Sequence, residues 1–231
     1  MGVSQAFKLI LNALKAAWDH AAALVILNMA WFCLILAPMF LDALIKGPTV
    51  MNLICTGVSI LLFGPVSAAT HCMIARILSD GEVSVREFFE ALKRFFWRSE
   101  LLFIGWLVVL LVLAWAFTGS GIQDTILMRI VNGICLYLVL VWFLVFQYLF
   151  PFLVQQDINV RLVLKRSTIL MFDNLLVSLM LLLLSGVLTF AAIMLVIPMV
   201  ILWFTVIGLM QNYVTVELLK KYSNGHSHDL N

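Results

Sequence analysis

The residue whose chemistry stands out in this sequence is His71, an imidazole inside a long apolar run. Ser67 precedes it by four residues, so one helical turn brings the hydroxyl and the ring to the same face. Ionisable groups at membrane depth are costly, and they are usually paired or functional. Two roles are open for His71: a proton relay or ligand contact, and an ordinary hydrogen bond between helices. The same choice, lining a polar cavity or bonding between helices, applies to five amides, which are Asn28, Asn132, Gln147, Gln211 and Asn212.

Motifs of common catalytic sites are absent from the sequence. It has no His-Glu-x-x-His, no Gly-x-Ser-x-Gly, no phosphate-binding loop and no pair of carboxylates within one apolar run. His226 and His228 near the C-terminus supply too few ligands for a metal site. We therefore expect no enzyme, no catalytic residue, no cofactor and no metal. Buried, inert thiols are expected for the four cysteines, which stand apart at Cys33, Cys55, Cys72 and Cys135.

The composition places these residues in a membrane. Hydrophobic residues make up 64% of the 231 residues and charged residues 11%, whereas soluble domains have about 45–50% and about 25%. Several apolar runs reach about 20 residues, the length of a helix that crosses about 30 Å of hydrocarbon. We expect one all-α domain, a polytopic bundle of six transmembrane helices in contact with the lipid bilayer. No surface suited to nucleic acid is expected. The expected spans cover residues 21–43, 49–77, 101–117, 126–154, 175–196 and 199–219.

The second span is long enough to be tilted or broken, and the proline positions indicate where a break in these helices would fall. Gly64-Pro65 falls in the middle of the second span, where the missing N–H of proline removes a backbone donor. Pro198 divides the last apolar run, which is too long for one span, so we expect a tight turn there.

Amphipathic helices are expected at residues 4–19, 84–98 and 158–171. The second of them, which we call the elbow (residues 84–98), begins with Ser84 and Glu87 at the spacing of a capping box. Apolar side chains then recur at helical spacing, and such a stripe must pack on the membrane surface or against the bundle. The candidate partner or membrane-surface contacts in the elbow are Phe88, Phe89, Phe95 and Trp97.

The distribution of lysine and arginine predicts the orientation. In the six-span arrangement, twelve of the 14 basic residues fall on one side, and only Lys46 and Arg129 fall on the other. The positive-inside rule places the twelve in the cytoplasm, together with both termini.

A weak internal repeat accompanies this arrangement, in which each amphipathic segment precedes a pair of spans. Leu-Lys pairs are common in helices, so chance can also produce the match, and the threefold repeat of one surface helix and one hairpin stays open. The aligned segments are Asn12-Ala13-Leu14-Lys15, Glu90-Ala91-Leu92-Lys93 and Leu162-Val163-Leu164-Lys165, followed by the acids Asp19, Glu100 and Asp173.

Short motifs occur in a characteristic order over nearly the whole chain. They are Asn28-Met29-Ala30-Trp31, Gly64-Pro65-Val66-Ser67-Ala68-Ala69, Glu87-Phe88-Phe89-Glu90-Ala91-Leu92-Lys93, Tyr148-Leu149-Phe150-Pro151 and Asn174. Together they resemble the YesL family of small bacterial membrane proteins. The resemblance implies a multi-pass protein of the bacterial plasma membrane with uncharacterised activity, associated with carbohydrate uptake and polysaccharide degradation. It supplies no catalytic or binding residues.

Two classes of function are compatible with these observations. In the first, the chain is an accessory or regulatory subunit of a solute-uptake system, and its amphipathic segments face another membrane protein. In the second, it is a small transporter or channel for a neutral solute such as a sugar, with helices broken around a polar cavity. The scarcity of charge within the spans favours the first, although a neutral sugar needs only amides and aromatic rings.

Overall fold

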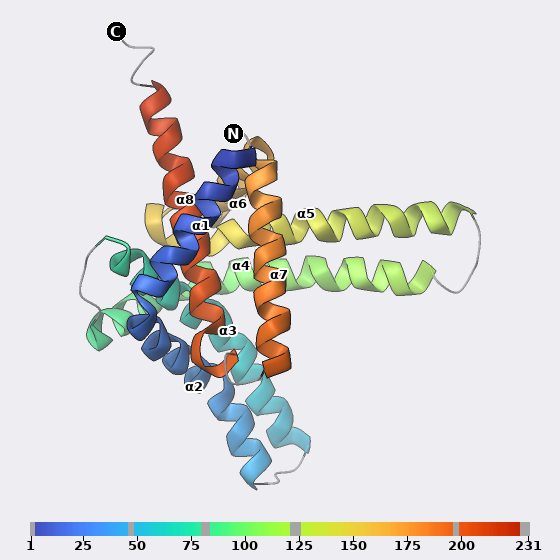
Figure 1. Ribbon diagram of the computed structural model, residues 1–231. Helices are drawn as coiled ribbons and strands as arrows, with labels where there is room; N and C mark the ends of the chain where they lie inside the picture. Colours follow the sequence, from blue (N-terminus) through green and yellow to red (C-terminus); the bar gives the residue numbers. More distant parts are fainter. Residues whose placement is uncertain (1–2, 46–48, 80–83, 121–125, 196–198, 227–231) are drawn as a thin grey trace.

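The computed structural model describes residues 3–45, 49–79, 84–120, 126–195 and 199–226, and within these ranges the protein contains helices and no strand (Figure 1). Six of the described helical segments are long and apolar enough to cross a membrane. The predicted polytopic helix bundle is therefore confirmed. The elements are α1 (Val3–Asp19), α2 (Ala21–Ile45), α3 (Thr49–Ile77), α4 (Val85–Ser120), α5 (Ile126–Gln156), α6 (Val160–Asp173), α7 (Leu175–Leu195), the π-helical turn η1 (Met199–Trp203) and α8 (Phe204–His226).

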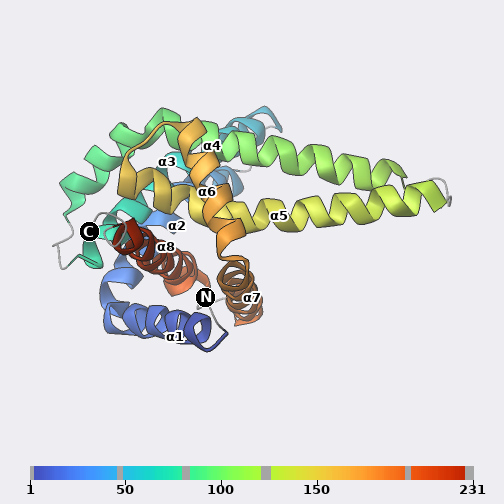
Figure 2. The same ribbon diagram turned by 90° about the horizontal axis from the view of Figure 1, so that it is seen from above.

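The elbow and the third expected span form one helix, α4. The sequence between them, Arg98 to Leu101, contains neither glycine nor proline. The hydroxyl of Ser99 donates to the carbonyls of Phe95 and Phe96 within the same helix, a back-bond that often bends a helix without ending it. The elbow is thus the first part of a longer helix, which bends where the elbow meets the hairpin arm (Figure 2), and the separate surface helix expected from the sequence is not present.

Proline does not interrupt α3, which continues through Pro65, so of the two alternatives for this span, tilted or broken, the break at Gly64-Pro65 is not present. Prolines are tolerated in membrane helices because neighbouring groups re-satisfy the freed backbone. Pro198 lies outside the described residues, but α7 ends at Leu195 and helix resumes at Met199, which agrees with the expected division.

Three helical hairpins extend from a shared core. Figure 1 shows the α4–α5 hairpin projecting sideways, while α2–α3 leaves in another direction and α7 runs beside α8. The view from above agrees: the α4–α5 hairpin is again the element that reaches farthest from the others (Figure 2). Its outer part carries large exposed apolar side chains such as Trp115 and Ile126, which suit contact with lipid.

Two contacts define how α3 and α4 pack. Arg76 pairs with Glu87 at 2.5 Å, and Gly64 lies against Glu100. The helices therefore run antiparallel, with the second half of α3 alongside the elbow. This packing buries Phe88 and Phe95 in the core.

The order of one amphipathic segment followed by one hairpin occurs three times along the chain. Between α1 and α2 only His20 separates the two helices, and between α6 and α7 only Asn174 does. In the middle unit no residue separates them, because α4 is continuous. The three aligned acids lie at these junctions, with Asp19 and Asp173 exposed and Glu100 buried.

Candidate functional site: a buried polar network

His71 lies at the centre of a polar network formed by α3, α5 and α8. Its ring is buried, stacks on Phe150 at 5.5 Å between ring centroids, and meets Phe204 edge-on at 5.8 Å. The side-chain nitrogen of Asn212 lies 2.7 Å from Nδ1 of His71. His71 is therefore in contact with Asn212, one of the five amides named from the sequence. Ser67, expected on the same face, instead accepts a hydrogen bond from Trp31 Nε1 at 3.1 Å.

The hydrogen bonds of Asn212 fix the tautomer of His71. Nδ2 of Asn212 also donates to the carbonyl of Gly208 at 2.9 Å, and Oδ1 accepts from Nε2 of Gln155 at 3.0 Å. Because Nδ2 is the donor, Nδ1 of His71 is the acceptor and the ring proton is on Nε2. The network thus contains a neutral imidazole.

The absence of a side chain at Gly208 lets α8 approach α3 closely at this point. A Cβ on Gly208 would lie 3.0 Å from Cδ1 of Ile74 and 3.4 Å from Cε1 of His71. Both distances are at or below ordinary van der Waals contact. Gly208 therefore allows the helix approach that brings Asn212 within reach of His71.

His71 lies nearer the charged end of α3 than its place in an apolar run suggests. It is six residues before Ile77, on the stretch between the contacts of Gly64 with Glu100 and of Arg76 with Glu87. The elbow, with its arginines and acids, therefore runs alongside the part of α3 that carries His71, whereas the ring itself contacts Phe150 and Phe204. The polar network therefore lies near the C-terminal end of α3 and not at the middle of that span.

Asn28 ties α2 to the irregular start of the last span. Its Oδ1 accepts from the backbone N–H groups of Phe204 and Thr205 at 3.0 and 3.2 Å, and its Nδ2 donates to the carbonyl of Val200 at 2.6 Å. A π-helical turn shifts backbone partners out of the α-helical register. The Asn28 side chain therefore bonds to the backbone of Val200 within the π-helical turn and to the backbone of Phe204 and Thr205 at the start of α8.

Gln147 ties α5 to α7. Its Nε2 donates to the backbone carbonyl of Ser178 at 3.0 Å, and the neighbouring Tyr148 hydroxyl lies 2.8 Å from the Ser178 hydroxyl. Both side chains on α5 are buried. This pair of contacts is a second helix tie, separate from the one at His71.

Two of the predicted polar residues do not join these networks. Asn132 is half-buried in the outer part of α5, 18 residues before Phe150 in the same helix, which corresponds to about 27 Å. Gln211 is also half-buried, and its backbone carbonyl accepts from the hydroxyl of Thr215 at 2.7 Å. The structure therefore unites His71 with Asn212 and not with Asn132 or Gln211.

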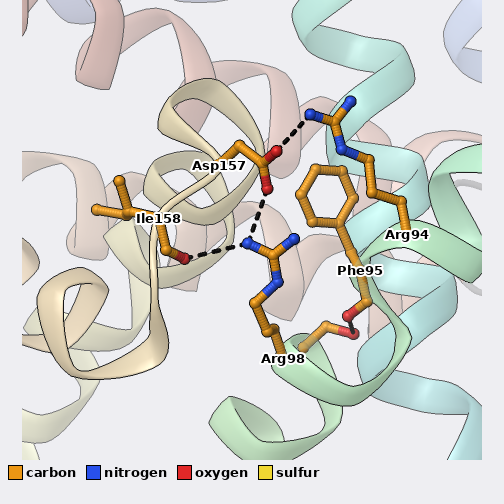
Figure 3. Close-up of polar contacts among 6 residues, drawn as sticks. Arg94, Phe95, Arg98, Asp157 and Ile158 are labelled. Atoms are coloured by element: carbon orange, nitrogen blue, oxygen red, sulfur yellow. Dashed lines mark hydrogen bonds and ion pairs between the residues drawn. The ribbon is translucent and has the colours of Figure 1, made fainter.

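Asp157 forms a charged junction that the sequence did not reveal (Figure 3). It has a left-handed backbone with φ of 48° and follows the last residue of α5. Its carboxylate pairs with Arg94 and, at 2.7 Å, with Arg98. Arg98 also donates to the carbonyl of Ile158 at 3.4 Å. The hydrogen bond from Arg94 lowers the pKa of Asp157; burial opposes this and Arg98 reinforces it.

The aromatic residues of the elbow divide into two pairs. Phe88 and Phe95 are buried in the core and are not available to a partner or to the membrane surface. Phe89 is 50% exposed and Trp97 is 74% exposed. The candidate contact surface of the elbow is therefore reduced to Phe89 and Trp97.

The remaining candidate ligands and thiols are histidines and cysteines. No three His, Cys, Asp or Glu side chains converge there in a way that could hold a metal ion. His226 ends α8, and His228 lies outside the described residues. All four cysteines are free thiols, and Cys33 is exposed, so the expectation of burial is wrong for that residue.

The fold and these contacts define a multi-pass helical membrane protein with a core that is tied by buried amides, one histidine and hydroxyls. In comparisons of the chain with known proteins, no family model, no curated protein and no solved structure matched.

Proposed function

We propose that this chain is an accessory or regulatory membrane subunit of a bacterial carbohydrate-uptake system, similar to YesL proteins, without enzymatic activity of its own. It lies in the plasma membrane with both termini and the elbow in the cytoplasm. The resemblance to YesL motifs and the strong bias of lysine and arginine to one side support this proposal.

The proposal rests on one observation: the buried polar side chains are engaged in contacts between helices. Asn28, Gln147 and Asn212 are the side chains that a solute site would need, and each bonds to a neighbouring helix or to backbone. His71 is enclosed between Phe150 and Phe204. Groups engaged in this way stabilise one packing of the helices.

Transport of a neutral solute is less well supported. Transporters of that kind bind substrate at interrupted helices whose free backbone groups point into a cavity. In this protein Asn28 occupies the backbone groups of Phe204, Thr205 and Val200 at the irregular start of the last span. The side chain and backbone groups that would bind a sugar are therefore hydrogen-bonded to one another between α2 and the last span.

The elbow offers the surface for a partner. Phe89 and Trp97 are exposed on a segment that also carries the exposed Lys93, next to the charged junction at Asp157. Exposed aromatic residues with a basic neighbour are common in protein interfaces and at membrane surfaces.

Affinity purification from native membranes tests the proposal. The wild type is expected to co-purify with a membrane component of a carbohydrate-uptake system, and the double variant F89S/W97S is expected to lose it while still inserting. Trp115→Ser is the matched control, because Trp115 is 76% exposed on the same helix but lies in the outer hairpin. Unchanged co-purification of the double variant would contradict the proposal, and so would sugar flux into proteoliposomes that contain only this chain.

A further inference from the structure

Glu100 is a buried acid that none of the networks above uses. It is 3% exposed, and neither of its carboxyl oxygens has a hydrogen-bond partner among the described residues. It lies on α4 where the elbow meets the apolar part of the helix. Oε2 is 2.7 Å from the position that a Cβ on Gly64 would occupy, so the carboxyl is pressed against the backbone of α3.

An ionised carboxylate is expensive in this position. Moving a charge out of water without donors or a counter-ion costs far more than burying a neutral polar group. The nearest basic residue in sequence, Arg98, is engaged by Asp157 and by the carbonyl of Ile158. A neutral carboxylic acid removes the charge and adds a donor.

The helices that pack on α4 offer no counter-ion to Glu100. These are α3, α5 and α6, and none of their ionisable groups forms a hydrogen bond with the Glu100 carboxyl. The Asp157 carboxylate, at the end of α5, is engaged by Arg94 and Arg98. The ionisable groups of these helices are Cys55, His71, Cys72 and Arg76 on α3, Arg129, Cys135, Tyr137 and Tyr148 on α5, and Arg161, Lys165, Arg166 and Asp173 on α6.

Pro65 frees a backbone acceptor on α3, close in sequence to the contact with Glu100. Pro65 has no N–H, so the carbonyl of Leu61 lacks its usual partner four residues on. Leu61 is about one turn from Gly64, the residue against which the carboxyl packs.

Of the three acids at the junctions between amphipathic segments and spans, only Glu100, in the middle unit, is buried. The acids at the other two junctions, Asp19 and Asp173, are exposed. Glu100 differs because α4 continues through the junction and packs on a glycine.

We propose that Glu100 is a proton-binding site: its carboxyl carries a proton while α3 and α4 are packed at Gly64, and it releases that proton to become a carboxylate when the two helices separate. The site couples proton binding to the packing of α3 on α4. It does not depend on the identity of a partner or on the proposed function.

Infrared spectroscopy of the full-length protein in lipid at neutral pH tests the proposal directly. The carbonyl stretch of a neutral carboxylic acid is separated from that of a carboxylate. The wild type and Asp19→Asn are expected to show the neutral-acid band, and Glu100→Gln is expected to lack it. Gln has the shape of the neutral acid, so this variant is expected to fold.

A second measurement, thermal unfolding against pH, reports the coupling to packing. The packed state binds a proton that the separated state releases, so the Tm of the wild type is expected to decrease as the pH rises from about 5 to about 9. Glu100→Gln is expected to lose this part of the pH dependence, whereas Asp19→Asn keeps it. Replacing Na⁺ and K⁺ with choline is expected to leave both proteins unchanged.

Three results would overturn the proposal. The first is a wild type without the neutral-acid band. The second is a Tm that depends on Na⁺ or K⁺ in the wild type but not in Glu100→Gln, which would assign the carboxyl to a metal cation. The third is a pH dependence that Glu100→Gln retains in full.

Discussion

Gly64 of α3 and Glu100 of α4 touch so closely that any side chain at position 64 would collide with its neighbour: a Cβ there would lie 2.7 Å from Oε2 of Glu100 and 2.8 Å from the backbone oxygen of Ser99. Together with the pair of Arg76 and Glu87 at 2.5 Å, this contact sets the register of the α3–α4 hairpin. Four predictions follow from this and other contacts.

Gly64→Ala is expected to lower the free energy of unfolding by about 1–3 kcal/mol, because the added methyl group overpacks a contact with rigid backbone. Gly105→Ala is the matched control on α4, since nothing lies within 4 Å of the Cβ position there. The control is expected to be neutral or to gain up to about 1 kcal/mol from helix propensity. Thermal unfolding in one detergent measures both. Equal stability of the two variants would show that the helices are not in contact at Gly64.

Asn212→Leu is expected to destabilise the protein by about 1–3 kcal/mol, because Nδ1 of His71 then stays buried without a donor. Gln155 also loses the side-chain acceptor Oδ1 and keeps only the backbone carbonyl of residue 212. The neighbouring substitution Gln211→Leu, at a half-buried position outside the network, is expected to have little effect. Denaturation curves of the two variants and the wild type measure the change in the free energy of unfolding. A harmless Asn212→Leu would mean that the network does not hold α3 to α8.

Asp157→Asn is expected to reduce the acid sensitivity of the protein. The lowered pKa of Asp157 means that the native state favours the carboxylate. Its stabilisation is present above the unfolded pKa of about 3.9 and is lost as the pH falls through the lower folded value. The pair is partly exposed, so the effect is expected to be at most about 1 kcal/mol. Asn tolerates a left-handed backbone as Asp does, so this substitution removes the charge without straining the backbone.

The measurement is unfolding between about pH 2 and about pH 7, compared with Asp19→Asn as an exposed control. At neutral pH, Asp157→Asn is expected to be less stable than the wild type, and the difference is expected to shrink in acid. A difference that stays constant over this range would contradict the ion-pair explanation.

Single cysteines introduced into a cysteine-free background are expected to report the orientation. Lys46→Cys should react with a membrane-impermeant maleimide in intact cells, and Lys93→Cys should react only after the membrane is opened. This follows from the twelve basic residues on the side of the elbow and the two on the other. Labelling of Lys93→Cys in intact cells would reverse the proposed topology.

The helices were largely predictable because hydrocarbon thickness sets their length. The span expected at residues 49–77 coincides with α3 (Thr49–Ile77), and the last two spans begin at the expected residues. Breaks were predicted less well. Pro65 lies inside an unbroken α3. The local preference of proline predicts a break, but it takes no account of the packing of α4 against that helix.

The candidate site was predictable in its residue types but not in its partners. A histidine and amides in apolar runs are visible in any sequence, and His71, Asn28 and Gln147 all proved to be buried. Which of them meet depends on register across helices that are distant in sequence, as with His71 and Asn212. Asp157 and Glu100 were missed for the same reason: only the packed structure shows that one is paired and the other is not.

The continuity of α4 has a mechanical consequence. The helix has 36 residues, a path of about 54 Å along its axis, and it bends between the elbow and the hairpin arm without ending there (Figure 2). By contrast, α1 and α2, like α6 and α7, are separate helices that meet at a single residue. A partner bound at Phe89 and Trp97 would therefore act on the same helix that forms one arm of the α4–α5 hairpin, whereas a partner on either of the other amphipathic helices would act on an element separate from its span.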